Sequence, residues 1–317
     1  MNAGAGRTCP LSYRYGPHAI RSCPEQQADT LYVIGGLYGN VPALDAIVAL
    51  AAGEPGPVTL CFNGDFNWFN VDDDGFATIN RAVLAHDALL GNVEAELFAP
   101  GDDAGCGCAY PESTDDGVVE RSNEIHARLK STARRHPDIV ERLRRLPMVR
   151  RYRIGDTAVG VVHGDAESLA GWRFDAAALD DAPNLRWLDT AFEQAGTDLF
   201  ASTHTCLPAL RRLDTGSRQR LVINNGAAGM PNFQGDRRGL ISRIGIGPSP
   251  HASAYGSRLG SIHVDALAVA YDPARWRQLF LQNWPAGSPA HRSYFERITQ
   301  GPNYRREQAG PAPAAAE

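Results

Sequence analysis

Short apolar runs alternate with helical patterns along the first half of the chain. Residues 31–35 form an apolar run that ends in glycine, and residues 41–50 then place apolar side chains at helical spacing, with a proline in the first turn where a helix tolerates it. A strand and a helix are predicted next at 58–62 and 76–86, followed by a brief third strand at 88–90. This alternation is typical of an α/β layered domain.

Strand patterns dominate the second half of the chain. Two arginine-rich helices are predicted first, at 118–134 and 138–145, and their charged residues are typical of solvated helix faces. Further strands are predicted at 150–154, 158–163, 198–202, 221–224 and 261–271, with a helix between residues 182 and 194. The second half therefore continues the layered domain with more strands than helices.

The flanks of this pattern set the expected domain limits. Residues 1–30 are rich in Gly, Pro and polar side chains without sustained periodicity, which indicates an N-terminal extension. The layered domain then covers 31–282, with a polar insertion at about 98–118. Residues 283–317 are expected to form a C-terminal cap and a tail, and the low-complexity tail from about residue 308 is expected to be disordered.

Composition narrows the class of protein. The 317 residues are 43% hydrophobic and 21% charged, as in soluble globular proteins. The net charge of −5 argues against general nucleic-acid binding or attachment to an anionic membrane, and no apolar run approaches the roughly 20 residues that cross a bilayer. Six cysteines are too sparse for a disulfide scaffold and favour a reducing compartment. We therefore expect a cytoplasmic protein.

Small or metal-ligating residues follow consecutive predicted strands. In layered α/β domains, ligands gather where strands end and loops begin. These strand ends therefore predict a site at one edge of the fold. The residues found there are Gly36, Tyr38, Asp65, Asn92, Glu94, His163, Asp165, His204 and Cys206.

The order of these strand-end motifs resembles the calcineurin-like metallophosphoesterase superfamily, particularly its small bacterial phosphodiesterase branch. That family strings together Gly-Asp, Gly-Asn-His, a lone His-Gly and Gly-His-x-His. The matching segments here are Gly64-Asp65, Gly91-Asn92, His163-Gly164 and Thr203-His204-Thr205. The resemblance covers about residues 31–272, and it implies a four-layer αββα sandwich of two mixed sheets flanked by helices.

The resemblance also implies one complete metal site. The ligands of the family's second metal match Asp65, Asn92, His163 and His204. One carboxylate, one amide oxygen and two imidazoles suit Mn, Fe, Zn or Ni, and four such ligands leave positions for water and a phosphoryl oxygen. We therefore expect one divalent ion per chain.

The ligands of the family's first metal are replaced together. The resemblance places Gly36, Tyr38 and Cys206 at those positions, and Val93 where the family has a histidine that assists the reaction. A single ion polarises a phosphoryl group and acidifies a bound water, but only a pair of ions about 3.5–4 Å apart clamps the attacking and leaving oxygens together. The pattern favours a surviving single-metal centre.

Several residues are candidates for proton transfer. Tyr38 offers a phenolic donor where a metal ligand is missing, or it fills the vacated space. Glu94 is a second candidate, and Asp165, His126 and His251 are further ones; all four are also typical of surface or turn positions.

Cysteines and aromatic residues leave further alternatives open. Cys206 is a possible additional metal ligand as a thiolate, or a small buried residue, and Cys106 and Cys108 either help to rebuild a site or are loop residues. Trp68 stacks on a nucleoside or aromatic leaving group, or packs in the core. Trp68 and Asn92 are the two candidate substrate-binding residues.

The leading interpretation is a metal-dependent phosphoesterase that hydrolyses a small phosphomonoester or phosphodiester by a metal-bound water. The alternative is a catalytically inactive protein of the same fold that binds a metal, a phosphate ligand or a protein partner. No pattern in the sequence points to a particular protein partner.

Overall fold

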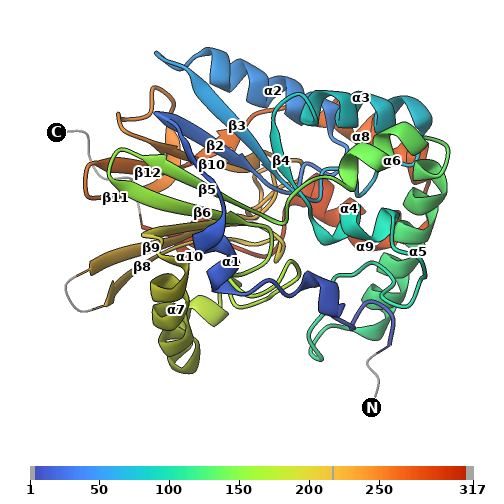
Figure 1. The fold of residues 1–317 in the computed structure, drawn as a ribbon. Coiled ribbons are helices and arrows are strands. Elements are labelled where there is room, and N and C mark those ends of the chain that lie inside the picture. The colour runs from blue at the N-terminus through green and yellow to red at the C-terminus, as the bar shows by residue number, and fades with distance from the viewer. Residues whose placement is uncertain (1–3, 216–217, 312–317) are drawn as a thin grey trace.

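The computed structural model describes residues 4–215 and 218–311, which contain two six-stranded mixed sheets packed face to face (Figure 1). The first sheet has the order β1-β5-β6-β7-β9-β8, and the second has the order β11-β12-β10-β2-β3-β4. The first comprises β1 (Glu25–Gln27), β5 (Val149–Ile154), β6 (Thr157–Val162), β7 (Leu199–Ser202), β8 (Pro208–Thr215) and β9 (Arg218–Asn225). The second comprises β2 (Thr30–Ile34), β3 (Val58–Asn63), β4 (Asp87–Leu89), β10 (Gly239–Gly245), β11 (Ser253–Leu259) and β12 (Ile262–Val269).

Helices cover the outer face of each sheet (Figure 1). Those on the second sheet are α2 (Val41–Ala52), α3 (Asp73–Val83), α4 (Asn92–Leu97), α5 (Asp116–Ala133), α6 (Pro137–Leu143), α8 (Pro273–Asn283) and α9 (Pro289–Gln300). Those on the first sheet are α1 (Pro17–Ser22) and α7 (Ala182–Ala195), whereas α10 (Arg306–Ala309) contacts the edge strands β8 and β11 of the two sheets. Short 3-10 turns lie at Leu11–Tyr13 and Ala178–Asp180. The predicted four-layer αββα sandwich is confirmed.

The alternation of side chains along β2 explains how one strand serves two cores. Leu31 and Val33 belong to the core between the sheets, whereas Tyr32 and Ile34 belong to the core under the helices. Successive residues of a strand point to opposite faces, so a strand that is apolar throughout is buried on both sides. The loops after the strands lie at the edge of the stacked sheets, where they bring polar side chains together.

Some elements differ from the sequence predictions. Strands β8, β10 and β11 and helices α8 and α9 were not predicted. β10 hides its strand character because Ser242 and Arg243 interrupt its apolar pattern, although both are buried, and Arg243 forms an ion pair with Glu54. Part of the N-terminal extension also joins the fold, since β1 pairs in parallel with β5.

The expectation of a disordered tail from residue 308 is wrong for residues 308–311. Gln308 accepts a hydrogen bond from the backbone N–H of Arg305, and Ala309 is fully buried against the first sheet. The rest of the predicted tail, 312–317, lies outside the described residues.

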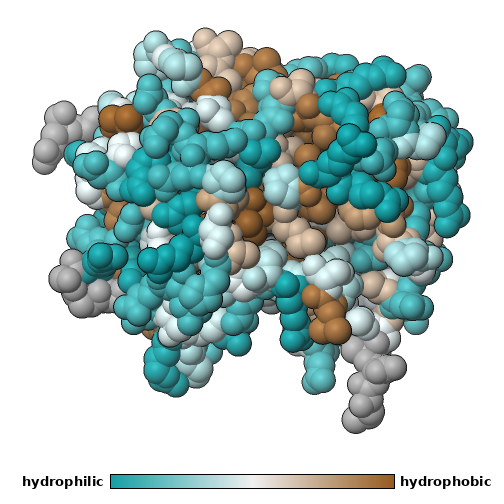
Figure 2. Space-filling model, viewed as in Figure 1, coloured by the Kyte–Doolittle hydropathy of each residue, from teal (hydrophilic) through white to brown (hydrophobic). Residues whose placement is uncertain are grey.

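The face drawn in Figure 2 is mostly polar, with apolar side chains interspersed. Among the described residues, the exposed large apolar side chains are Leu11, Val48, Leu185 and Ile246. Across the described part of the chain, no helix combines the length and the apolar character that crossing a membrane requires.

Candidate metal centre

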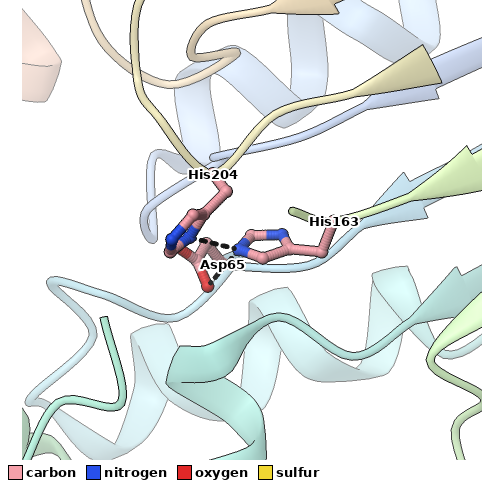
Figure 3. Close-up of side chains that lie close together, drawn as sticks. All are labelled: Asp65, His163 and His204. Atoms are coloured by element: carbon pink, nitrogen blue, oxygen red, sulfur yellow. Dashed lines mark hydrogen bonds and ion pairs between the residues drawn. The ribbon is translucent and has the colours of Figure 1, made fainter. Parts of the chain in front are cut away.

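Four ligand atoms from four strand ends converge at one edge of the stacked sheets. Asp65 lies just after β3, Asn92 after β4, His163 after β6 and His204 after β7. The Nε2 atom of His163 lies 3.3 Å from Oδ1 of Asp65 and 3.3 Å from Nδ1 of His204 (Figure 3). The same Nε2 atom lies 3.1 Å from Oδ1 of Asn92. The structure therefore brings together all four predicted metal ligands.

Backbone carbonyls fix the orientation of both imidazoles. Nδ1 of His163 lies 2.8 Å from the carbonyl oxygen of Asn63, and Nε2 of His204 lies 3.2 Å from that of Cys108. A carbonyl oxygen only accepts, so these nitrogens carry the protons and donate them. In the neutral rings, Nε2 of His163 and Nδ1 of His204 then present lone pairs to the centre, as metal-ligating histidines do.

The two oxygen ligands are oriented in the same manner. The amide nitrogen of Asn92 donates to the carbonyl of Cys106 over 2.9 Å, which turns its Oδ1 toward the centre. Oδ1 of Asp65 accepts from the backbone N–H of Val93 over 3.2 Å. Four lone-pair atoms thus face one another, and a cation relieves their mutual repulsion. The set of ligands fits a divalent metal ion.

The loops reach this geometry through backbone conformations that most residues avoid. Asp65 has a φ of 53° and His204 a φ of 37°, in the left-handed region. Gly91 permits the close approach of the loops, because a Cβ there would lie 2.2 Å from Oδ1 of Asp65. Strained backbone of this kind clusters at functional sites, where the surrounding structure holds it.

Glu94 fixes the loop that carries Asp65 through hydrogen bonds to its backbone. Its Oε2 accepts from the backbone N–H of Asp65 over 2.7 Å and from that of Gly91 over 3.3 Å, and its Oε1 accepts from the N–H of Asn67 over 3.2 Å. Burial, together with the negative charge of Asp65, raises the pKa of Glu94 to about 7. Glu94, predicted as a proton carrier, lies outside the cavity lining and positions Asp65 through the backbone.

The electrostatics of Asp65 and His204 suit metal ligation, whereas the carboxylate of Asp65 favours the charged form of His163, with which a cation would compete. Burial raises the pKa of Asp65, but His163 and His204 outweigh this effect and the net pKa lies below its usual value. Burial lowers the pKa of His163, yet Asp65 brings the net value above normal. Burial and the neighbouring His163 lower the pKa of His204 to about 3, which keeps that ring neutral. Metal ligation needs an ionised carboxylate and neutral imidazoles.

Comparison with solved structures places this site within a known fold. A metallophosphoesterase from Sphaerobacter thermophilus is similar with a TM-score of 0.55 and 19% identity over 86% of this chain and 100% of that one. The chain has the metallophosphoesterase fold. A hypothetical protein from Pyrococcus horikoshii OT3 is similar with a TM-score of 0.52 and 15% identity over 87% of this chain and 99% of that one. No family model matches the sequence, and no curated protein matches it.

The three positions at which the sequence resemblance implies replaced ligands, Gly36, Tyr38 and Cys206, lie together. Oη of Tyr38 lies 3.0 Å from Sγ of Cys206. A Cβ built on Gly36, which has a φ of 65°, would lie 2.8 Å from the end of the Tyr38 ring. Tyr38 therefore occupies the space into which a side chain at position 36 would project.

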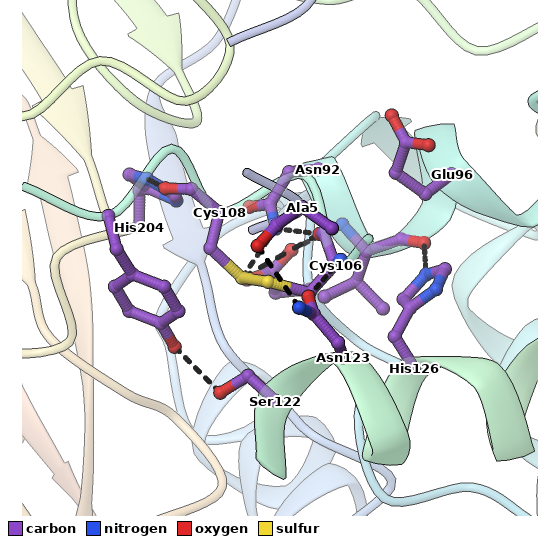
Figure 4. The surroundings of a disulfide bond; sticks show 12 residues. Ala5, Asn92, Glu96, Cys106, Cys108, Ser122, Asn123, His126 and His204 are labelled. Atoms are coloured by element: carbon purple, nitrogen blue, oxygen red, sulfur yellow. Dashed lines mark hydrogen bonds between the residues drawn. A yellow bond between two sulfur atoms is a disulfide. The ribbon is translucent and has the colours of Figure 1, made fainter. Parts of the chain in front are cut away.

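Among the described residues, the cysteines are not part of the candidate ligand cluster. Cys106 and Cys108 form a disulfide in the insertion, so their sulfur atoms are withdrawn from metal ligation (Figure 4). Cys206 contacts Tyr38, and it is not part of the described Asp65, His163 and His204 cluster. The insertion contributes through its backbone instead, because its carbonyls hold two of the ligands.

The remaining proton-carrier candidates lie outside the cavity lining. Asp165 uses its carboxylate to accept backbone N–H groups of its own loop, from Glu167 and Arg173 among others. Nε2 of His126 lies 3.0 Å from the carbonyl oxygen of Val93, and burial lowers its pKa to about 4. His251 contacts the C-terminal end of α2, where its Nε2 lies 2.8 Å from the carbonyl oxygen of Leu50.

A cavity of about 190 Å³ opens onto three of the candidate ligands, Asp65, Asn92 and His204. Its lining includes Tyr38 and Trp68, as well as residues that the sequence analysis missed. The lining comprises Tyr38, Asp65, Trp68, Asn92, Val93, Cys108, Tyr110, Trp172, His204, Thr205, Cys206, Tyr294 and Arg297. The missed residues come from the insertion, from the loop after β6 and from α9, which carry no motif that marks them in the sequence.

Proposed function

We propose that the chain is a metal-dependent phosphoesterase that holds one divalent ion with Asp65, Asn92, His163 and His204 and hydrolyses a small phosphomonoester or phosphodiester. The convergence of four lone-pair atoms, three of them on side chains locked by backbone carbonyls, carries this proposal. Mn, Fe, Zn and Ni suit these ligands. When bound, the ion supplies Lewis-acid polarisation and lowers the pKa of water.

The walls of the cavity support a small ester with an aromatic or apolar organic group. Trp68, Tyr110, Trp172 and Tyr294 contribute aromatic rings to its lining. Such rings stack on flat groups and exclude water. The volume of about 190 Å³ favours a compact substrate over a long polymer. Trp68, with these other aromatic residues of the lining, remains the candidate for contacting the organic group of the substrate.

Metal analysis combined with turnover tests the proposal. The protein is purified without added metal, its metal content is measured by mass spectrometry, and hydrolysis of p-nitrophenyl phosphate and bis-p-nitrophenyl phosphate is followed with Mn, Fe, Zn and Ni. We expect about one equivalent of metal and turnover, both lost in His163→Ala. His18→Ala removes an exposed imidazole and serves as the matched control.

Two results would contradict the proposal. Wild-type protein that holds no metal after loading would exclude the ion site. Metal bound by Asp65, His163 and His204 without turnover of either ester would favour the alternative of an inactive binding protein.

A further inference from the structure

A guanidinium without a carboxylate partner lines the same cavity as the metal ligands. Arg297 extends from α9; its Nη2 donates to the carbonyl of Cys206 over 2.6 Å, and its Nε donates to that of Pro231 over 3.1 Å. Among the described residues no carboxylate pairs with Arg297, whereas the buried Arg220 and Arg243 each pair with two. A cation held only by neutral carbonyls beside a cavity is available to bind an anion.

The hydroxyl group of Tyr38 lies next to Cys206, the residue whose carbonyl accepts from Arg297. Oη of Tyr38 lies 3.0 Å from Sγ of Cys206, whose carbonyl accepts from Arg297. Tyr38 also lines the cavity, and its ring has little freedom because it lies over Gly36. The position at which the family's first metal ligands align thus holds one hydroxyl donor, with one cation next to it.

We propose that Arg297 and Tyr38 form an anion-binding subsite that holds the phosphoryl oxygens of the substrate. The bonds come from the uncommitted Nη1 of the guanidinium and from the phenol hydroxyl. The ligand class is a tetrahedral oxyanion, which a guanidinium binds with directed, charge-assisted hydrogen bonds. This inference rests on the proposed function and deepens it.

The subsite supplies what a single metal ion lacks. Negative charge develops on phosphoryl oxygens during transfer, and positive groups already in place stabilise it without reorganisation. In the metallophosphoesterase pattern a second ion provides this charge. Here Arg297 provides it from the C-terminal cap, and Tyr38 adds a neutral donor from the loop after β2.

Binding of inorganic phosphate tests the subsite separately from turnover. Calorimetric titrations compare wild-type protein with Arg297→Gln, Arg297→Lys and Tyr38→Phe, each in metal-loaded and EDTA-treated form. Metal content and circular dichroism are recorded for every protein. Arg292→Gln is the matched control, because Arg292 lies on the same helix and is exposed.

We expect Arg297→Gln to weaken phosphate binding about tenfold or more in both forms, as loss of a charge-assisted hydrogen bond does. Arg297→Lys retains part of the affinity, because lysine keeps the charge without the planar fork. Tyr38→Phe weakens binding about threefold, and Arg292→Gln leaves it unchanged. Metal content stays at the wild-type level in all four variants.

The subsite is overturned if folded Arg297→Gln binds phosphate within about twofold of wild type, or if wild-type protein does not bind phosphate. Should Arg297→Gln fail to fold, unchanged affinity in Tyr38→Phe overturns it. If the protein hydrolyses the esters but Arg297→Gln binds phosphate as wild type does, the result contradicts this inference alone. If phosphate binding depends on Arg297 but the protein neither holds metal nor hydrolyses the esters, the result contradicts only the proposed function.

Discussion

The side-chain amide of Asn92 donates to the backbone carbonyl of Cys106 over 2.9 Å, and this bond directs the amide oxygen toward His163. His204 is held in the same way by the carbonyl of Cys108. Two of the four candidate metal ligands therefore depend on the loop that the disulfide closes. The order of this loop and the affinity of the metal centre are expected to change together.

Removal of the disulfide is expected to weaken metal binding without removing a ligand. The double variant Cys106→Ser, Cys108→Ser frees the loop whose carbonyls orient Asn92 and His204. Loss of such supporting bonds lowers metal affinity about 10–100-fold in metalloproteins, and we expect the lower end of this range because the carbonyls remain. Chelator competition measures the affinity.

The control for the disulfide variant is Cys23→Ser. Cys23 is a free cysteine in the N-terminal extension, next to the carbonyl of Val149. Wild-type affinity in the double variant would show that the loop keeps its shape without the disulfide.

Glu94→Gln is expected to loosen the Asp65 loop. The glutamine places an NH₂ group among backbone N–H donors that now share a carboxylate. We expect the free energy of unfolding to fall by about 1–3 kcal/mol, the cost of leaving a buried N–H donor without its acceptor, together with weaker metal binding. Urea denaturation and metal titration measure the two effects. Glu112→Gln, at an exposed position, should change neither.

Gly36→Ala is expected to displace Tyr38. The new Cβ would lie 2.8 Å from the tyrosine ring at a φ of 65°, so backbone strain adds to a steric clash. The matched control is Gly260→Ala, at a φ of 58° with nothing within 4 Å of the added carbon. We expect a loss of about 1 kcal/mol in the control and about 2–4 kcal/mol at Gly36.

Relief of this clash is the decisive measurement. Thermal and urea unfolding of Gly36→Ala are compared in the wild-type and Tyr38→Ala backgrounds. The extra loss at Gly36 should disappear once the ring is removed. Equal losses at Gly36 and Gly260 would contradict the packing of Tyr38 over Gly36.

The ion pair of Glu54 and Arg243 predicts a pH dependence of stability. Their side chains are 1% and 2% exposed. Burial raises the pKa of Glu54, but the hydrogen bonds from Arg243 and Tyr32 outweigh it, so the net pKa lies below its usual value. A folded-state pKa below the unfolded one stabilises the native state at neutral pH, and this contribution is lost as the pH falls through the folded pKa.

We expect Glu54→Gln to lower the free energy of unfolding by about 1.5–3 kcal/mol near neutral pH, because Arg243 loses its hydrogen bonds to the Glu54 carboxylate and keeps only Asp265, 3.6 Å away. The difference from wild type should shrink below about pH 4, where the wild-type carboxyl also becomes neutral. Urea denaturation across this range measures it. The exposed Glu141 pairs with Arg145, and Glu141→Gln should change stability by less than about 1 kcal/mol at every pH.

Local patterns predicted most of the first half of the fold. The strand at 31–35 and the helix at 41–50 lie where β2 and α2 are found, because continuous apolar runs and helical spacing report burial directly. β10 escaped prediction because Arg243 is buried by a distant carboxylate that its own segment does not reveal. α8 escaped because Trp276 and Phe280 are its only buried residues among polar ones.

The sequence by itself singled out the four candidate ligands, through the resemblance of its motifs to those of metallophosphoesterases. Asp65, Asn92, His163 and His204 each lie near the end of a strand, and the structure brings them together. Only the tertiary structure decided which backbone groups orient these ligands and which side chains line the rest of the cavity. Arg297 meets the carbonyl of a residue 91 positions away. Periodicity records the burial of a segment, whereas contacts between loops from different layers depend on how the whole sandwich closes.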